Sequence, residues 1–182
     1  MSAGVRGPSV VLACGNPSRG DDAIGPLLLA RLEAWLAESG CAENFVLVEE
    51  FQLQVENALD LQGMSAALFI DAGEGTAVPY SLSPAVAGEI AGHSSHALSP
   101  AAVLAVYQRV TGEAPPPADV LCVCGESFEL GAPPSTAALA HVEAAWPALQ
   151  AWCRTHRRPG ETVSAGGGTM SHGDCGRNVT KA

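Results

Sequence analysis

The sequence predicts a layered α/β domain, and three observations support this fold class. An apolar run rich in β-branched residues at 9–14 leads directly into a Gly-Asn-Pro turn, as a strand entering a tight loop does. Apolar residues at helical spacing follow, from Ile24 to Leu36. The segment 67–70 is an uninterrupted apolar run, typical of a strand buried on both faces of a parallel sheet. Ligands of such sheets bind at the carboxyl ends of the strands, so functional residues are expected there.

The first half of the chain predicts three strands and two helices. The first helix carries an apolar stripe of Ile24, Leu28, Leu32, Trp35 and Leu36 and ends at Ser39-Gly40. A second strand is predicted over 45–48, a short helix over 52–61 and a third strand over 66–70. We expect Asp71 to follow the end of this third strand and 72–75 to form a turn.

The second half predicts an edge strand over 77–82, weakened by Pro79, and a later strand over 119–124. Between them, a helix starts at Ser99 and Pro100 and ends at Gly112. A last helix follows, capped by Ser135. The expected buried faces of these two helices are Val103, Val106, Tyr107 and Val110, and Leu139, Val142, Trp146, Leu149 and Cys153.

The composition indicates one folded domain. A chain of 182 residues is long enough for one domain with a sizeable core and too short for two. We expect residues 1–156 to form this domain and the Gly/Ser-rich segment 157–182 to be a disordered tail. The net charge of −10 argues against nucleic acid or an anionic membrane as a partner. The sequence contains neither a membrane-length apolar run nor a signal pattern, so we expect a cytoplasmic protein.

Acidic and histidine residues from three loops are predicted to meet at one rim of the sheet. They are Asp21 and Asp22, Asp71, and His93 and His96. Two carboxylates and one imidazole, with room for a water or a substrate ligand, suit Zn²⁺ or Ni²⁺. Each residue also has a structural explanation. Asp21 or Asp22 could cap the first helix, and Asp71 could bind backbone amides at its strand end. His93 could lie in solvent, and His96 could belong to a loop that packs below the Ser99 cap.

Other chemistries are less consistent with the sequence. The first loop lacks both glycine-rich phosphate-binding spacings, and its two carboxylates would repel a phosphate. Ser94 and Ser95 lack the surroundings of a nucleophilic serine, and there is no His-Glu-x-x-His helix. None of the six cysteines forms a Cys-x-x-Cys pair, and Cys14, Cys122 and Cys124 are interpreted as small buried residues.

Four segments resemble motifs of the nickel-iron hydrogenase maturation endopeptidases. Residues 15–26, Gly-Asn-Pro-Ser-Arg-Gly-Asp-Asp-Ala-Ile-Gly-Pro, are similar to the N-terminal signature of that family. Phe-Ile-Asp-Ala at 69–72 and Ser-His-Ala-Leu-Ser-Pro at 95–100 resemble its second and third motifs. The segment 125–131 resembles its late Gly-rich segment, and the whole resemblance covers about residues 10–152.

The resemblance implies a three-layer α/β/α fold with a five-stranded, mostly parallel sheet. It also implies an endopeptidase that removes a C-terminal extension from the precursor of the hydrogenase large subunit once nickel has been inserted. By motif, the metal-contacting positions of the family correspond to Asp22, Asp71 and His96. Asp22 stands where some members have Glu. A Gly-rich segment common in the family is replaced by Phe-Gln-Leu-Gln-Val-Glu at 51–56, which resembles the branch serving soluble NAD-linked hydrogenases.

These expectations lead to a working hypothesis with two rivals. Asp22, Asp71 and His96 would complete the coordination of nickel carried by the precursor, and Asp21 or Asp22 would assist proton transfer from a water. The protein is expected to act as a monomer. One rival is a non-catalytic nickel-dependent assembly chaperone with the same ligands. The other is a hydrolase or phosphorylase of small phosphorylated or nucleoside substrates, which would need a basic pocket although Arg19 is the only nearby cation.

Overall fold

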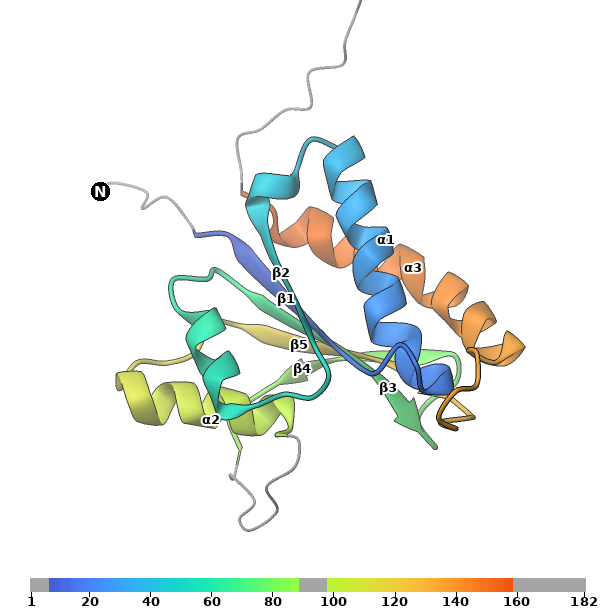
Figure 1. The fold of residues 1–182 in the computed structure, drawn as a ribbon. Coiled ribbons are helices and arrows are strands. Elements are labelled where there is room, and N and C mark those ends of the chain that lie inside the picture. Colours follow the sequence, from blue (N-terminus) through green and yellow to red (C-terminus); the bar gives the residue numbers. More distant parts are fainter. Residues whose placement is uncertain (1–6, 89–97, 159–182) are drawn as a thin grey trace, which may run out of the picture.

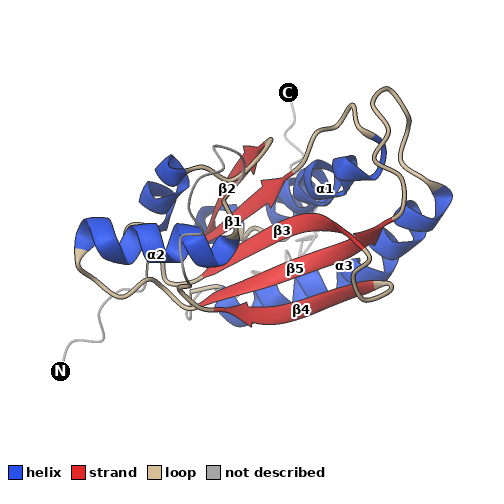
Figure 2. Ribbon diagram, turned by 90° about the horizontal axis from the view of Figure 1, so that it is seen from below, coloured by secondary structure: helices blue, strands red, loops and turns tan. Residues whose placement is uncertain are grey.

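The computed structural model describes residues 7–88 and 98–158. Within them the strands form one five-stranded sheet in the order β2-β1-β3-β5-β4, and Figure 2 shows the strands side by side in this order. Four strands are parallel and β4 is antiparallel to its neighbour β5. Their bounds are β1 Ser9–Cys14, β2 Phe45–Glu50, β3 Ala67–Glu74, β4 Tyr80–Ala85 and β5 Ala118–Gly125.

Helices cover both faces of the sheet and make the three-layer α/β/α architecture that the resemblance implied (Figure 1). On one face lie α1 (Ile24–Glu38) and α3 (Thr136–His156); on the other lie α2 (Pro100–Thr111) and the 3-10 helix η3 (Val55–Leu61). Side chains alternate along each strand, so Val11 and Ala13 of β1 enter the core under α1 and α3, while Val10 and Leu12 enter the other core.

The third strand is longer than predicted. It runs to Glu74, so the expectation that a turn at 72–75 ends it after Ile70 was wrong. Pairing with β1 does stop at Ile70, but pairing with β5 continues to Glu74. The polar residues of this segment are compatible with a strand because only one neighbour flanks it and part of it remains exposed. The predicted edge strand is confirmed, shifted to Tyr80–Ala85.

The helix starts agree with the predictions, but the buried faces agree only in part. Ser99 and Ser135 cap α2 and α3 by accepting hydrogen bonds from Ala102 N–H and Ala138 N–H. The buried stripe of α3 is Ala138, Val142, Ala145, Leu149, Trp152 and Cys153. Leu139 was therefore wrongly placed on it and is 46% exposed, because the smaller Ala138 takes the inward position. Val110, in the last turn of α2 beyond the buried residues of that helix, is 67% exposed and was also wrongly placed.

Two of the sequence predictions lie outside the described residues. His93 and His96 fall in the undescribed segment 89–97, and only Arg157 and Arg158 of the expected tail are described. No helix in the described ranges is long and apolar enough to cross a membrane.

Candidate active site

Three side chains form a row at the carboxyl ends of neighbouring strands. Cys14 pairs in register with Glu50 of β2, and Ala13 pairs with Ile70, so Asp71 is the next residue of β3 alongside Cys14. Cys14 enters the core under α2 and η3, and strand alternation directs Asp71 and Glu50 to the same face. Asp71 is the first residue of β3 beyond its pairing with β1, so it lies at an open edge of the sheet.

Cys14 responds electrostatically to all three carboxylates of this region. Burial is the largest of the causes that raise the pKa of its thiol to about 12, and the negative charges of Asp71, Glu50 and Asp22 contribute in the same direction. The side chain is 7% exposed, so it is a neutral, buried thiol, as the sequence indicated. Asp22 binds the N–H of Asn16, two residues after Cys14, and Asp71 follows the residue paired with Ala13, so both carboxylates lie on one rim.

Asp22 is placed by a tight loop between β1 and α1. Its Oδ2 atom accepts a hydrogen bond of 3.0 Å from the N–H of Asn16, and the side chain is half-buried. Gly15, between β1 and this turn, has φ of +142°, and a Cβ there would lie 1.9 Å from the carbonyl oxygen of Asp22. The glycine is therefore required for the backbone to pass so close to Asp22.

Asp71 keeps a solvent-exposed side chain and accepts a 2.8 Å hydrogen bond from Ala72 N–H through Oδ1. The backbone amide bond was one expectation for this residue, although the strand does not end there. The protein around the carboxyl removes water from part of it and raises its pKa to about 6. The Ala72 hydrogen bond acts in the opposite direction, and the charge of Asp22 adds to the rise. A carboxyl with this pKa can exchange a proton near neutral pH.

Asp21 has a different environment from that of Asp22. It has no exposed surface, and its carboxylate accepts hydrogen bonds from Glu126 N–H (2.7 Å), Ser127 N–H (2.9 Å), Ser135 N–H (2.6 Å) and the Ser135 hydroxyl (3.0 Å). Burial alone would raise the pKa of Asp21, but the hydrogen bonds from Ser135, Glu126 and Ser127 outweigh it and hold the pKa below its ordinary value. Asp21 therefore fastens the loop before α3 rather than capping the helical turn that contains it.

Backbone contacts extend this junction between the loops at 16–22 and 126–135. Asp21 N–H donates to Ser127 carbonyl oxygen (2.7 Å), and Gly20 N–H donates to Ala132 carbonyl oxygen (3.0 Å). Arg19 Nε donates to the Phe128 carbonyl oxygen at 2.9 Å. The one cation that the sequence placed near this rim is thus bound to a carbonyl group, as part of the loop junction.

The described residues supply two of the three predicted metal-contacting side chains. Among residues 7–88 and 98–158, no group of three or more His, Cys, Asp or Glu side chains is arranged to hold a metal ion. The third predicted ligand, His96, lies outside those ranges. The described chain resumes at Leu98, which packs in the core under α2 and η3 and donates a 2.8 Å hydrogen bond from its N–H to Leu53 carbonyl oxygen.

Comparison with known proteins finds similarity in structure only. No protein-family model matches the chain, and no curated protein matches it. Solved structures do match. The hydrogenase maturating endopeptidase HybD from E. coli has a TM-score of 0.64 at 22% identity, covering 81% of this chain and 93% of its own. The [NiFe] hydrogenase maturation protease HycI from Thermococcus kodakarensis has a TM-score of 0.60 at 20% identity, covering 84% and 95%.

A hydrogenase 2 maturation peptidase from a Thaumarchaeota archaeon has a TM-score of 0.57 at 18% identity, covering 81% of this chain and 98% of its own. The fold is that of the hydrogenase maturation endopeptidases. The shared fold spans nearly the whole length of those proteins, and its carboxyl rim is where Asp22 and Asp71 lie in this chain.

Sequence reasoning missed two features of this rim. Glu50 and Cys14 lie in one row with Asp71. The alternation of side chains along the predicted strands could have placed all three on the same face of the sheet. The role of Asp21 had no local signal, since its partners lie 105 to 114 residues away in the chain.

Proposed function

We propose that this protein is an endopeptidase that removes the C-terminal extension of a nickel-iron hydrogenase large-subunit precursor after nickel insertion. The observation that carries the proposal is the placement of the Asp22 and Asp71 carboxylates on one rim of a fold shared with [NiFe] hydrogenase maturation proteases. The nickel is part of the substrate in this proposal, because it arrives with the precursor. Asp22, Asp71 and His96 would contact it and so distinguish a loaded precursor from an empty one.

The donor set fits this role. Carboxylate oxygens and an imidazole nitrogen are ligands that Ni²⁺ accepts. Asp22 receives one hydrogen bond from the described residues and Asp71 receives one, so both carboxylates retain lone pairs for a ligand. Leu98, two residues after His96, packs on the face to which strand alternation directs Asp71, which supports His96 as the third contact.

The proton acceptor in peptide hydrolysis would be Asp22 or Asp71. A bound metal would polarise the attacking water or the scissile carbonyl group. Asp71, with a pKa of about 6, is suited to take a proton from water near neutral pH. The earlier alternative, Asp21, is less suitable because four hydrogen bonds already occupy its carboxylate.

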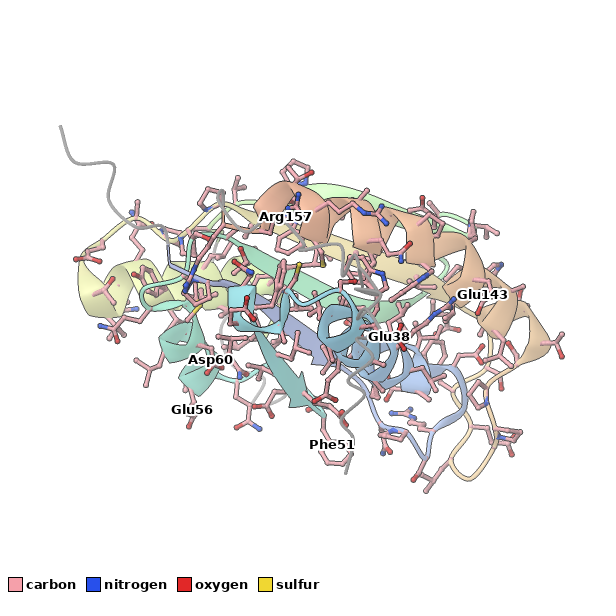
Figure 3. The ribbon with its side chains drawn as sticks, turned by 90° about the horizontal axis from the view of Figure 1, so that it is seen from above. Glu38, Phe51, Glu56, Asp60, Glu143 and Arg157 are labelled. Atoms are coloured by element: carbon pink, nitrogen blue, oxygen red, sulfur yellow. The ribbon has the colours of Figure 1, made fainter. Side chains whose placement is uncertain are left out.

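We further infer that the precursor belongs to a soluble NAD-linked hydrogenase. The support is the segment 51–56, which departs from the Gly-rich segment common in the family. It follows Glu50 directly at the rim, and its first residue, Phe51, is 68% exposed. Figure 3 shows Phe51 projecting away from the ribbon at the end of β2, where it could contact a substrate.

The deciding experiment combines the purified protein with nickel-loaded and nickel-free precursor and weighs the precursor by mass spectrometry. We expect loss of a C-terminal peptide from the nickel-loaded precursor only. Asp22→Ala, Asp71→Ala and His96→Ala should leave it intact. Glu74→Ala, which removes an exposed carboxylate from the same strand as Asp71, is the matched control and should cleave normally. A precursor that binds but keeps its full mass would instead support the assembly chaperone.

A further inference from the structure

A pocket of about 410 Å³ lies at the opposite edge of the sheet from the rim with Asp22 and Asp71. It is found where β2 begins and where α1 and α3 end. Its floor is apolar, and the residues that form it are each at most 8% exposed: Leu36, Cys41, Phe45 and Cys153. Small-molecule sites in proteins have volumes of roughly 300–1,000 Å³ and are mostly apolar with a few polar groups.

The mouth of the pocket is cationic. Arg154 and Arg157 line it, and the guanidinium carbon of Arg154 lies 5.5 Å from the centre of the Trp35 ring. Figure 3 shows Arg157 on the opposite side of the view from Phe51, which marks the carboxyl end of β2. The pocket and the proposed active site thus lie at opposite ends of β2, a six-residue strand about 20 Å long.

The arginines at this end of α3 have no carboxylate partner among the described residues. The chain has 19 Asp and Glu residues against nine Lys and Arg, so carboxylates are plentiful. In the described ranges, however, the one ion pair joins Arg31 to Glu143 and involves none of Arg154, Arg157 and Arg158. The Arg158 Nε atom is buried and, within those ranges, has no hydrogen-bond partner. Two guanidinium groups that line one pocket without a carboxylate partner in the described ranges favour an external anion.

We propose that this pocket binds a small amphipathic carboxylate, with its apolar chain on the floor and its carboxylate at Arg154 and Arg157. The floor supplies the apolar contact and the guanidinium groups supply charge-assisted hydrogen bonds, which a carboxylate can accept in pairs. The site is independent of the proposed endopeptidase activity, because it shares no residue with the rim.

The test uses decanoate as the probe and the full-length protein. Binding is followed by tryptophan fluorescence and by backbone amide shifts in NMR spectra. Decanol keeps the chain but lacks the charge, and acetate keeps the charge but lacks the chain. We expect decanoate to shift the amide signals of Cys41 and Phe45, decanol to bind about fivefold more weakly, and acetate to cause no shift at equal concentration. Arg157→Gln should weaken decanoate binding severalfold, while Arg109→Gln, an exposed arginine on α2, should not.

Three results would overturn the proposal. The first is equal binding of decanol and decanoate, which would make the pocket simply apolar. The second is amide shifts that map away from Cys41 and Phe45, or no binding. The third is binding that appears only in a variant ending at Arg158, which would indicate that the segment 159–182 occupies the pocket. Urea unfolding is the control for the fold of Arg157→Gln. A midpoint equal to that of the wild type would show that weaker binding by the variant does not come from a damaged fold.

Discussion

Asp21 and Asp22 are adjacent in the chain, yet one lies in a sealed junction and the other at an open rim. Asp21 has no exposed surface and accepts four hydrogen bonds from the loop at 126–135. Asp22 is half-buried and accepts one hydrogen bond, from Asn16, within the described residues. Successive residues of a 3-10 turn point about 120° apart, so one acidic pair can face two environments.

The two environments separate a carboxylate that stabilises the fold, Asp21, from one that can contact a substrate, Asp22. A carboxylate with all its acceptor positions occupied contributes to the fold and has little capacity left for a substrate. A carboxylate with open lone pairs beside a second negative charge has that capacity, although it adds less to stability. The sealed junction therefore holds the loop that presents Asp22, and Asp22 with Asp71 remains available for chemistry.

The largest expected effect is on precursor processing by Asp22→Ala. If Asp22 contacts the substrate nickel, its removal should slow the shortening of the precursor about 10³-fold, since a ligand and a candidate proton acceptor are both lost. The free energy of unfolding should change by less than about 1 kcal/mol because only one partly buried hydrogen bond is lost. Mass spectrometry over time gives the rate, and urea unfolding gives the stability. Processing within tenfold of wild type would remove Asp22 from the mechanism.

Asp21→Ala should have the opposite profile, with stability reduced by about 3 kcal/mol. The substitution leaves three partly buried backbone N–H groups, those of Glu126, Ser127 and Ser135, without their acceptor. Urea unfolding measures the loss, with Asp22→Ala as the matched control. Equal stability of the two variants would show that the junction is not held by this carboxylate. Since the bonds to Asp21 lower its pKa, its contribution is present above the ordinary value and disappears as pH falls through the lowered one.

Gly20→Ala tests the junction through its backbone and should cost about 2 kcal/mol. Gly20 has φ of +53°, and a Cβ there would lie 2.3 Å from the carbonyl oxygen of Ser127, which accepts the Asp21 N–H bond. Gly40 is the control because it has φ of +64° but open space around its would-be Cβ. Gly40→Ala should therefore lower the free energy of unfolding by only about 1 kcal/mol, from the strain of an alanine at positive φ. Equal losses in urea unfolding would mean that the close approach to Ser127 carries no cost.

The sequence predicted the features that depend on near neighbours. The helical stripe from Ile24 to Leu36 and the cap at Ser99 were correct because their signals lie within a few residues. Asp71 was expected at the carboxyl rim because the apolar run before it marks a buried strand. The predictions that were wrong concern features that depend on residues far away in the chain or on packing.

The extension of β3 to Glu74 comes from pairing with residues of β5 that lie 51 positions later, as Glu74 with Gly125, which the polar residues of this segment do not reveal. Leu139 was misplaced because Ala138 takes the inward position in α3, a choice decided by packing rather than by hydrophobicity. The bonds of Asp21 reach across more than 100 residues, so an acidic residue at a helix start was indistinguishable from an ordinary cap.

Asp71→Asn should have the smallest effect on stability, and the pH dependence of that effect tests the open rim. The pKa of Asp71 is about 6, above its ordinary value of 3.8, so the folded state favours the protonated form. The stability from this preference is complete below pH 3.8 and is lost as pH rises through about 6. The variant has no carboxyl to ionise, so its stability relative to wild type should rise over this window and then level off. The gain should stay below about 1 kcal/mol, because solvent screens an exposed carboxylate.

Urea unfolding from pH 3.5 to 8 measures the curve, and Asp22→Asn is the comparison background. Removing the Asp22 charge takes away one cause of the raised pKa, so Asp71→Asn should then give a smaller rise with pH. The same difference in both backgrounds would show that burial alone sets the pKa of Asp71. The two carboxylates would then share the rim without influencing one another, and the contrast with the sealed Asp21 would rest on hydrogen bonding alone.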